Sequence, residues 1–179
     1  NSDRYQTQVI DIKYEGNGLK GIISYLNKKS KNKRNSIDHS KIESELFESV
    51  SVTSSTTYSN SYAPENVLQL ENDSLFGSKN QPDQWICFDF KDNLVQVKSY
   101  SIRSSNFWGQ NQEHPRNWIL ECSNDKKRWK TIDKRTDCNE LNEKGVTKTF
   151  IVESQHKKSR YFRLKQTGEN CKGNYCFNI

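Results

Sequence analysis

The side chains that could perform acid–base or metal chemistry are few and scattered in this 179-residue chain. The histidines are His39, His114 and His156, and no two of them have the helical i, i+4 spacing of a metal-binding pair. The sequence contains no Gly-x-Ser-x-Gly elbow and no Cys-x-x-Cys pair, and Cys171 and Cys176 lack the spacing of an ordinary zinc site. We therefore predict a protein that is not an enzyme and uses no metal and no cofactor.

One acidic residue, Asp89, lies within the apolar run Gln84–Phe90. A carboxylate is costly to bury without a partner, so we favour a structural contact with a backbone amide or an arginine over a catalytic role. Side chains alternate between the two faces of a strand. The two faces of this run are Trp85, Cys87 and Asp89 on one side, and Ile86, Phe88 and Phe90 on the other. We expect a central strand with Trp85 in the core.

The residues best suited to binding lie in and beside the stretch Ser104–Pro115. This stretch has no strand pattern, and unstructured connections of such length are usually functional or disordered. It contains Trp108, and the hydrogen-bond donors Arg103, His114 and Arg116 surround that residue in the sequence. Aromatic and arginine side chains are enriched at binding hot spots, so this stretch is a candidate site for a sugar or a protein partner.

Composition limits the class of protein. The net charge is +6 and the pI about 9.0, but the basic residues are dispersed, and no nucleic-acid-binding motif occurs, so we do not expect nucleic acid as a partner. No apolar run approaches the length of about 20 residues that a transmembrane helix requires. An odd number of cysteines without a framework spacing favours free thiols in a reducing compartment. The cysteines are Cys87, Cys122, Cys138, Cys171 and Cys176.

Short alternating segments joined by turn-forming residues fill the chain from residue 46 to 179. This pattern, without intervening helices, predicts an all-β antiparallel sandwich. The expected strands cover residues 50–52, 84–90, 95–103, 118–123, 129–133, 149–152 and 160–166.

The first 45 residues form a separate N-terminal segment in this interpretation. From Leu19 onward, apolar residues recur at i, i+3, i+4 and i+7, which predicts one amphipathic helix over about 18–28. A helix this short must dock on another part of the protein to be stable. Residues 27–36 then form a polar basic linker, which we interpret as a solvated connection rather than a localisation signal.

Five stretches match the motifs of one family, in that family's order. They are Val52–Thr56, Tyr58-Ser59 with Ala63–Leu68, Gln84–Phe90, Trp118–Asp125 with Trp129, and Arg160–Leu164. From about residue 48 the chain thus resembles the coagulation factor 5/8 type C (discoidin-like, galactose-binding-like) domain, of the Asn- and Lys-rich type seen in unicellular eukaryotes. The resemblance implies an eight-stranded jelly-roll sandwich over residues 46–179.

The resemblance also implies that binding loops converge at one end of the sandwich. Here those loops supply Tyr58, Tyr62, Phe76, Arg103, Asn106, Phe107, Trp108, His114 and Arg116. Three features depart from the family. No cysteine near residue 48 can tie the two ends of the domain, the loop 72–78 lacks the pattern that accompanies calcium, and the chain stops where the family's last strand should begin.

We expect a non-catalytic binding module, used for protein–protein interaction or structural assembly as a scaffold domain. The cysteine pattern favours an intracellular location, cytoplasmic or cytoskeleton-associated. The alternative is a carbohydrate-binding, lectin-like domain, and a second alternative is binding to a phospholipid surface.

Overall fold

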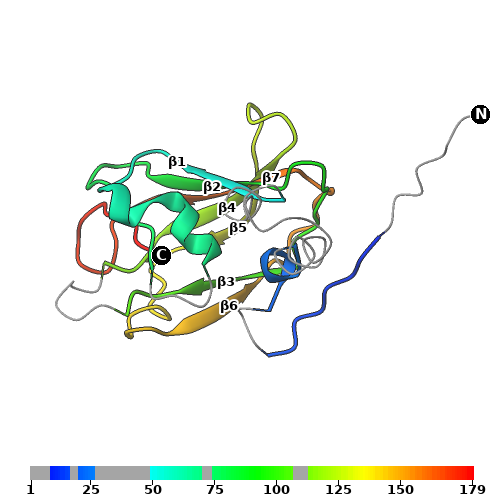
Figure 1. Ribbon diagram of the computed structural model, residues 1–179. Helices are drawn as coiled ribbons and strands as arrows, with labels where there is room; N and C mark the ends of the chain where they lie inside the picture. Colours follow the sequence, from blue (N-terminus) through cyan, green and yellow to red (C-terminus); the bar gives the residue numbers. More distant parts are fainter. Residues whose placement is uncertain (1–8, 17–19, 27–48, 70–73, 107–112) are drawn as a thin grey trace, which may run out of the picture.

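The protein is described by a computed structural model at residues 9–16, 20–26, 49–69, 74–106 and 113–179. In these residues the chain forms two antiparallel sheets that face one another as a sandwich (Figure 1). The larger sheet has the order β1-β2-β7-β4-β5, and the smaller sheet pairs β3 with β6. The all-β sandwich expected from the sequence is confirmed.

The strands agree closely with the segments expected from alternation. They are β1 (Ser51–Ser54), β2 (Trp85–Asp89), β3 (Ser99–Arg103), β4 (Trp118–Ser123), β5 (Lys130–Arg135), β6 (Thr147–Ile151) and β7 (Tyr161–Gln166). Two short 3-10 helices, η3 (Asn60–Tyr62) and η4 (Pro64–Leu68), connect β1 to the later part of the chain. Pro64 begins η4, because its fixed φ suits a first helical position.

Trp118 joins the two sheets at the centre of the core. It is fully buried on β4, and its ring packs edge-on against Phe150 of β6 with a centroid distance of 5.3 Å. Its Nε1–H donates to the Tyr100 hydroxyl at 2.9 Å, and that hydroxyl donates to Asp133 Oδ2 at 2.6 Å. Burial, and then the hydrogen bond to Asp133, raise the pKa of Tyr100 above its ordinary value. Strands β3, β4, β5 and β6 are thus linked through one indole.

The expected placement of Trp85 in the core was wrong. β2 does lie between β1 and β7, but Ile86 is its fully buried residue and Trp85 is half-buried on the outer face of the larger sheet. The register pairs Ile86 with Leu164, and both side chains join the core. Trp85 instead lies near Arg163, whose guanidinium carbon is 6.0 Å from the indole centroid. Both faces of this run carry apolar residues, so alternation alone did not identify the inner one.

Asp89 has the structural partners expected for it. Arg160 donates from Nε to Oδ1 at 2.7 Å and from Nη2 to Oδ2 at 3.1 Å, and the Lys91 N–H donates to Oδ1 at 2.8 Å. Burial acts to raise the pKa of Asp89, but the Arg160 and Lys91 hydrogen bonds outweigh it and hold the pKa below its ordinary value. The carboxylate therefore fixes the end of β2 to the start of β7.

The expected helix is present at residues 22–26, where Leu26 is buried and Ile22 and Ile23 pack against the core. Lys20 and Gly21, also in the expected range, form a bend before the helix, whereas 18–19, 27–28 and the linker 27–36 lie outside the described residues. A largely apolar cavity of about 790 Å³ is lined by this N-terminal part and by residues of β3 and its flanking segments. None of the helices among the described residues combines the length and apolar character that crossing a membrane demands. All five cysteines are free.

Replacing Ile86 with Ala is expected to lower the free energy of unfolding by about 2–5 kcal/mol, because it opens a cavity in the core. Trp85→Ala removes a half-exposed side chain and should cost less. Urea denaturation of both variants measures the two losses. A larger loss for Trp85→Ala would contradict the observed orientation of β2.

Asp89→Asn is expected to lower the free energy of unfolding by about 1.5–3 kcal/mol near neutral pH, since it removes a charged acceptor. Because the folded-state pKa is depressed, the contribution is present above the unfolded-state pKa of about 3.9 and is lost as the pH falls further. The difference from wild type should therefore shrink in strong acid. Asp92→Asn, at an exposed turn position, is the control and should have little effect at any pH.

Candidate functional site

Five connecting segments meet at one end of the sandwich, here called the Tyr58 end. Because the strands are antiparallel, β1, β7 and β5 finish at this end, and β2 and β4 begin there. The segments are 55–62, 77–84, 113–117, 136–146 and 167–178. The chain's C-terminus and the loop after β7 lie at this end, on the left of Figure 1.

Glu113 is the centre of a polar cluster at the Tyr58 end. Asn174 Nδ2 donates to its Oε1 at 2.9 Å, and Asn178 Nδ2 donates to its Oε2 at 3.1 Å. Lys172 Nζ lies 3.9 Å from Oε1. The side chains of Glu113 and Lys172 are 23% and 42% exposed, so solvent and ligands can reach both. We call Glu113, Lys172, Asn174 and Asn178 the Glu113 cluster.

The loop that supplies most of this cluster is held from within by Asn170, which is almost fully buried. Its Nδ2 donates to Asn174 Oδ1 at 2.6 Å and to the Cys176 carbonyl at 2.9 Å. Its Oδ1 accepts from the backbone N–H of Lys172 and Asn174. Gly173 turns the chain with a φ of 81°, which glycine adopts without strain. The Glu113 cluster is therefore preorganised.

Two tyrosines continue the surface beside the Glu113 cluster. Tyr58 is 66% exposed, and its ring meets that of Tyr62 edge-on at a centroid distance of 5.6 Å. The Tyr58 N–H donates to the Gly77 carbonyl at 2.8 Å, which fixes this loop. A Cβ on Gly77 would lie 3.0 Å from Asn178 Oδ1 and 3.3 Å from Tyr62 Cδ1. Gly77 thus allows the aromatic pair and the cluster to approach closely.

The structure brings only part of the predicted site together. Tyr58 and Tyr62 are neighbours, whereas Phe76 is fully buried and is corrected to a core residue that supports the loop. Arg103 is the last residue of β3 and pairs with Thr147, and Asn106 Oδ1 lies 3.0 Å from a Cβ built on Gly145. Both therefore lie at the Tyr58 end, on the side of the smaller sheet.

The remaining predicted residues flank the loop before β4. Arg116 pairs with Asp137 at 3.2 Å. His114 is 2% exposed, so its imidazole is buried and is not presented on the loop surface as predicted, and its backbone carbonyl accepts from the Cys171 N–H. Phe107 and Trp108 lie outside the described residues.

Sequence reasoning missed the whole Glu113 cluster. Its members come from positions 113 and 172–178, which are about sixty residues apart and meet only in the folded sheet order. One signal was available: Asn and Gly recur between Gln166 and Phe177, where turn-forming residues indicate a structured loop. Among the described residues, no group of three or more His, Cys, Asp or Glu side chains could hold a metal ion.

One family model matches most of the chain. Residues 51–178 match the F5/8 type C domain, and the chain belongs to that family. The resemblance identified in the sequence is thereby confirmed.

Individual proteins add detail to this assignment. The chain is 40% identical over 81 residues to the E3 ubiquitin-protein ligase hecd-1 of Caenorhabditis elegans, which is 45% of this chain and 3% of that protein. Among solved structures, the Clostridium perfringens module CpGH89CBM32-5, in complex with GalNAc-β-1,3-galactose, has a TM-score of 0.57 at 13% identity, covering 73% of this chain and 94% of that chain. A fucolectin from striped bass (Morone saxatilis) has a TM-score of 0.56 at 14% identity, covering 73% and 44%. At these identities the solved structures establish the fold alone.

His114 should make the protein less stable in mild acid. Its imidazole is buried, which lowers its pKa, and its Nδ1 has no hydrogen-bond partner among the described residues. The unfolded chain binds a proton near pH 6.5, whereas the folded chain binds it only at lower pH, so unfolding becomes easier as the pH falls below about 6.5. The variant His114→Gln should lose part of this pH dependence. Urea denaturation at pH 7.5 and pH 5 measures it, and an unchanged slope in the variant would refute the assignment.

Proposed function

We propose that this domain is a non-catalytic binding module that binds a carbohydrate at the Tyr58 end. The observation that carries the proposal is an exposed tyrosine ring beside a preorganised carboxylate, amide and ammonium cluster. Ligand sites combine apolar or aromatic surface with a few fixed polar groups, which provide orientation and specificity. Tyr58 offers the aromatic surface, and the Glu113 cluster offers the fixed polar groups.

The chemistry of the Glu113 cluster suits sugar hydroxyls, which donate and accept hydrogen bonds. Glu113 retains acceptor capacity beyond its bonds to Asn174 and Asn178, because each carboxylate oxygen has two lone pairs. Lys172 adds a charged donor, and hydrogen bonds to ionised groups are stronger than neutral ones. The apolar face of a sugar ring can pack on Tyr58, whose aromatic ring is both apolar and rigid.

The same groups support a binding role without catalysis. Glycoside hydrolysis ordinarily requires two carboxylates placed on either side of the bond that breaks. The Glu113 cluster contributes one carboxylate, and both of its oxygens already accept hydrogen bonds from asparagine amides. These contacts suit a fixed acceptor better than a group that exchanges protons.

Structural relatives favour a glycan over the scaffold role that the sequence analysis placed first. One similar structure is described as a complex with GalNAc-β-1,3-galactose, and another as a fucolectin. Because their sequence identity to this chain is low, these structures support carbohydrate binding only through the shared fold. Which sugar is bound depends on the side chains of this chain.

A protein partner is the second candidate, favoured by the similarity to hecd-1, which is described as a ubiquitin-protein ligase. A cytoplasmic or cytoskeleton-associated location would accompany this candidate. In that case the Tyr58 end would present the same aromatic and charged groups to a polypeptide, because such residues also serve protein interfaces.

Glycan-array binding of the purified chain tests the proposal with galactose-, N-acetylgalactosamine- and fucose-terminated oligosaccharides. We expect Tyr58→Ala and Lys172→Ala each to weaken binding about tenfold or more, since each removes a direct contact. The matched controls Tyr14→Ala and Lys98→Ala, at exposed positions elsewhere, should bind normally.

The outcomes separate the two candidates. If the array retains no glycan, while Tyr58→Ala abolishes capture of a protein that the wild-type chain pulls down, the second candidate replaces the first. Equal glycan binding by all four variants would show that the binding site lies outside the Tyr58 end.

A further inference from the structure

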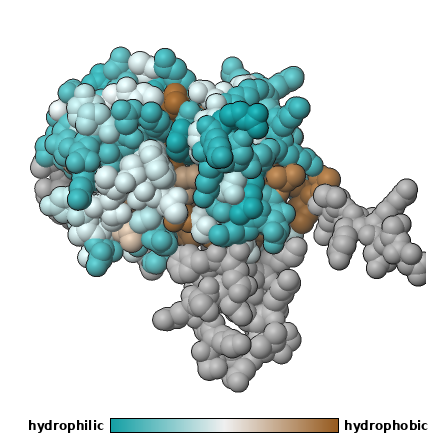
Figure 2. All heavy atoms as spheres, turned by 90° about the horizontal axis from the view of Figure 1, so that it is seen from above, coloured by the Kyte–Doolittle hydropathy of each residue, from teal (hydrophilic) through white to brown (hydrophobic). Residues whose placement is uncertain are grey.

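The opposite end of the sandwich, here called the Arg160 end, carries a different kind of surface. It is formed by residues 90–98, 124–130 and 152–160, at the ends of β2 and β4 and the beginnings of β5 and β7. Seen from above the larger sheet, hydrophilic residues cover most of the visible described surface (Figure 2). None of the side chains of the Glu113 cluster belongs to this end.

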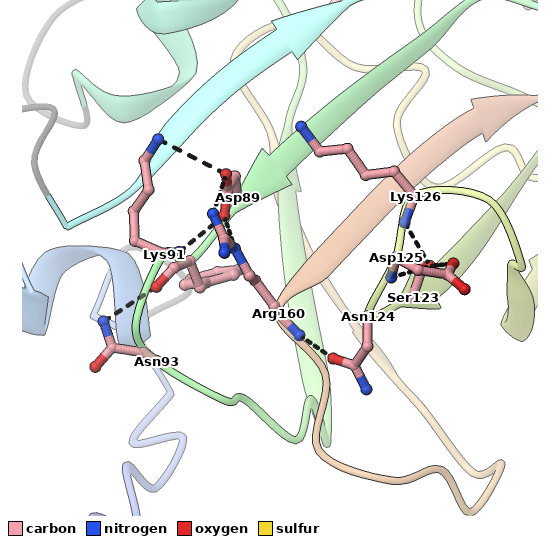
Figure 3. A network of polar contacts seen from close by, with 9 residues as sticks. Asp89, Lys91, Asn93, Ser123, Asn124, Asp125, Lys126 and Arg160 are labelled. Atoms are coloured by element: carbon pink, nitrogen blue, oxygen red, sulfur yellow. Dashed lines mark hydrogen bonds and ion pairs between the residues drawn. The ribbon is translucent and has the colours of Figure 1, made fainter.

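A rigid turn presents three consecutive cations at the Arg160 end. Ser123 Oγ accepts from the N–H groups of Asp125 and Lys126, and Asp125 Oδ1 accepts from those of Lys127 and Arg128. Figure 3 shows how the serine and aspartate side chains face the turn while the Lys126 side chain extends away from them. The turn is therefore held by its own hydrogen bonds, and Lys126, Lys127 and Arg128 are exposed.

A second basic loop lies directly beside this turn. Lys130 Nζ donates to the Gln155 carbonyl at 2.7 Å, and the Arg160 N–H donates to Asn124 Oδ1 at 2.9 Å. Asn124 Nδ2 is 3.4 Å from the Lys158 carbonyl. These contacts bring Lys157 and Lys158, both exposed, next to the turn.

Two of the four acids near this surface already pair with other cations. Asp89 is paired with Arg160 and Lys91, and Asp125 with Arg128. The ammonium groups of the neighbouring lysines take no part in these pairs. These lysines are Lys126, Lys127, Lys157 and Lys158. The other two acids of this end, Asp92 and Glu153, are exposed. The surface thus has an excess of positive charge.

We propose that the Arg160 end binds an acidic polypeptide segment through Lys126, Lys127, Lys157 and Lys158. The charged side chains lie on two short adjacent loops whose backbones are fixed, so carboxylates can be bound with little loss of backbone freedom. Complementary charge also steers a partner toward its site and selects against basic partners. This proposal is independent of the carbohydrate site, which lies at the other end of the strands.

The same surface is less suited to a nucleic acid or a membrane. Single-stranded nucleic acids stack their bases on open aromatic faces, but the Tyr161 ring has Lys126 Nζ at 4.7 Å and the Arg160 guanidinium at 4.9 Å from its centroid. Membrane binding by loop tips needs exposed apolar side chains. Leu94, in the segment 90–98 of this end, is 61% exposed, but none of the large exposed apolar side chains of the described residues lies on the two lysine-bearing loops 124–130 and 155–160.

The test measures fluorescence anisotropy of a labelled peptide of alternating glutamate and serine, at about 20 mM and about 150 mM salt. The double variant Lys127→Glu with Lys158→Glu should weaken binding about fivefold or more. The control is Lys20→Glu with Lys79→Glu, which changes the net charge equally at exposed positions elsewhere. It should change binding by less than about twofold, and all variants should keep the wild-type melting temperature.

Three results would overturn the proposal. The first is an equal loss in the control variant, which would mean that only net charge matters. The second is tighter binding of oligothymidylate or of phosphatidylserine vesicles than of the peptide, which would assign the surface to another class of partner. The third is the absence of peptide binding to the wild-type chain at the lower salt concentration. Glycan binding at the Tyr58 end should be unchanged in the Lys127→Glu, Lys158→Glu variant in every case, so the two proposals fail separately.

Discussion

The ion pair between Asp89 and Arg160 is the contact on which the arrangement of the larger sheet depends. It joins the last residue of β2 to the residue before β7, and β7 is the middle strand of that sheet. A carboxylate this little exposed would be costly without its bidentate arginine and the Lys91 N–H. The pair lies at one end of the register in which Ile86 meets Leu164 in the core and Trp85 lies on the outer face, and it stabilises that pairing.

The antiparallel order separates two surfaces of different chemistry. At the Tyr58 end, an Asn-rich loop held by Asn170 brings amides and one ammonium to Glu113, which lies beside two tyrosines. At the Arg160 end, short turns present exposed lysines, and two nearby acids, Asp89 and Asp125, are paired with other cations. A strand has two ends, so one small sandwich can carry both surfaces without either disturbing the other.

Membership of the F5/8 type C family establishes the scaffold and leaves the ligand to the loops. The similar solved structures share about one residue in eight with this chain, which is enough for the fold and too little to carry over a binding site. Backbone pairing and core packing tolerate such divergence, whereas a sugar site depends on individual side chains at the loop tips. The role proposed for the Glu113 cluster therefore depends on the contacts within this chain.

Much of the fold was determined by the sequence alone. Alternation located the strands, because a half-buried strand needs one apolar face. Amphipathic spacing predicted a helix over about 18–28, of which 22–26 is helical in the structure. The cost of burying a charge predicted a backbone amide or an arginine beside Asp89, and the structure has both.

The tertiary structure decided the rest. Alternation could not tell which side of Gln84–Phe90 faces inward, since both sides are rich in apolar residues, and the pairing with β7 made that choice. It could not show that Phe76 and His114 are buried, nor that Glu113 meets Asn174 and Asn178. Those contacts join loops that are distant in the chain, and only the order of the strands in the sheet brings such loops together.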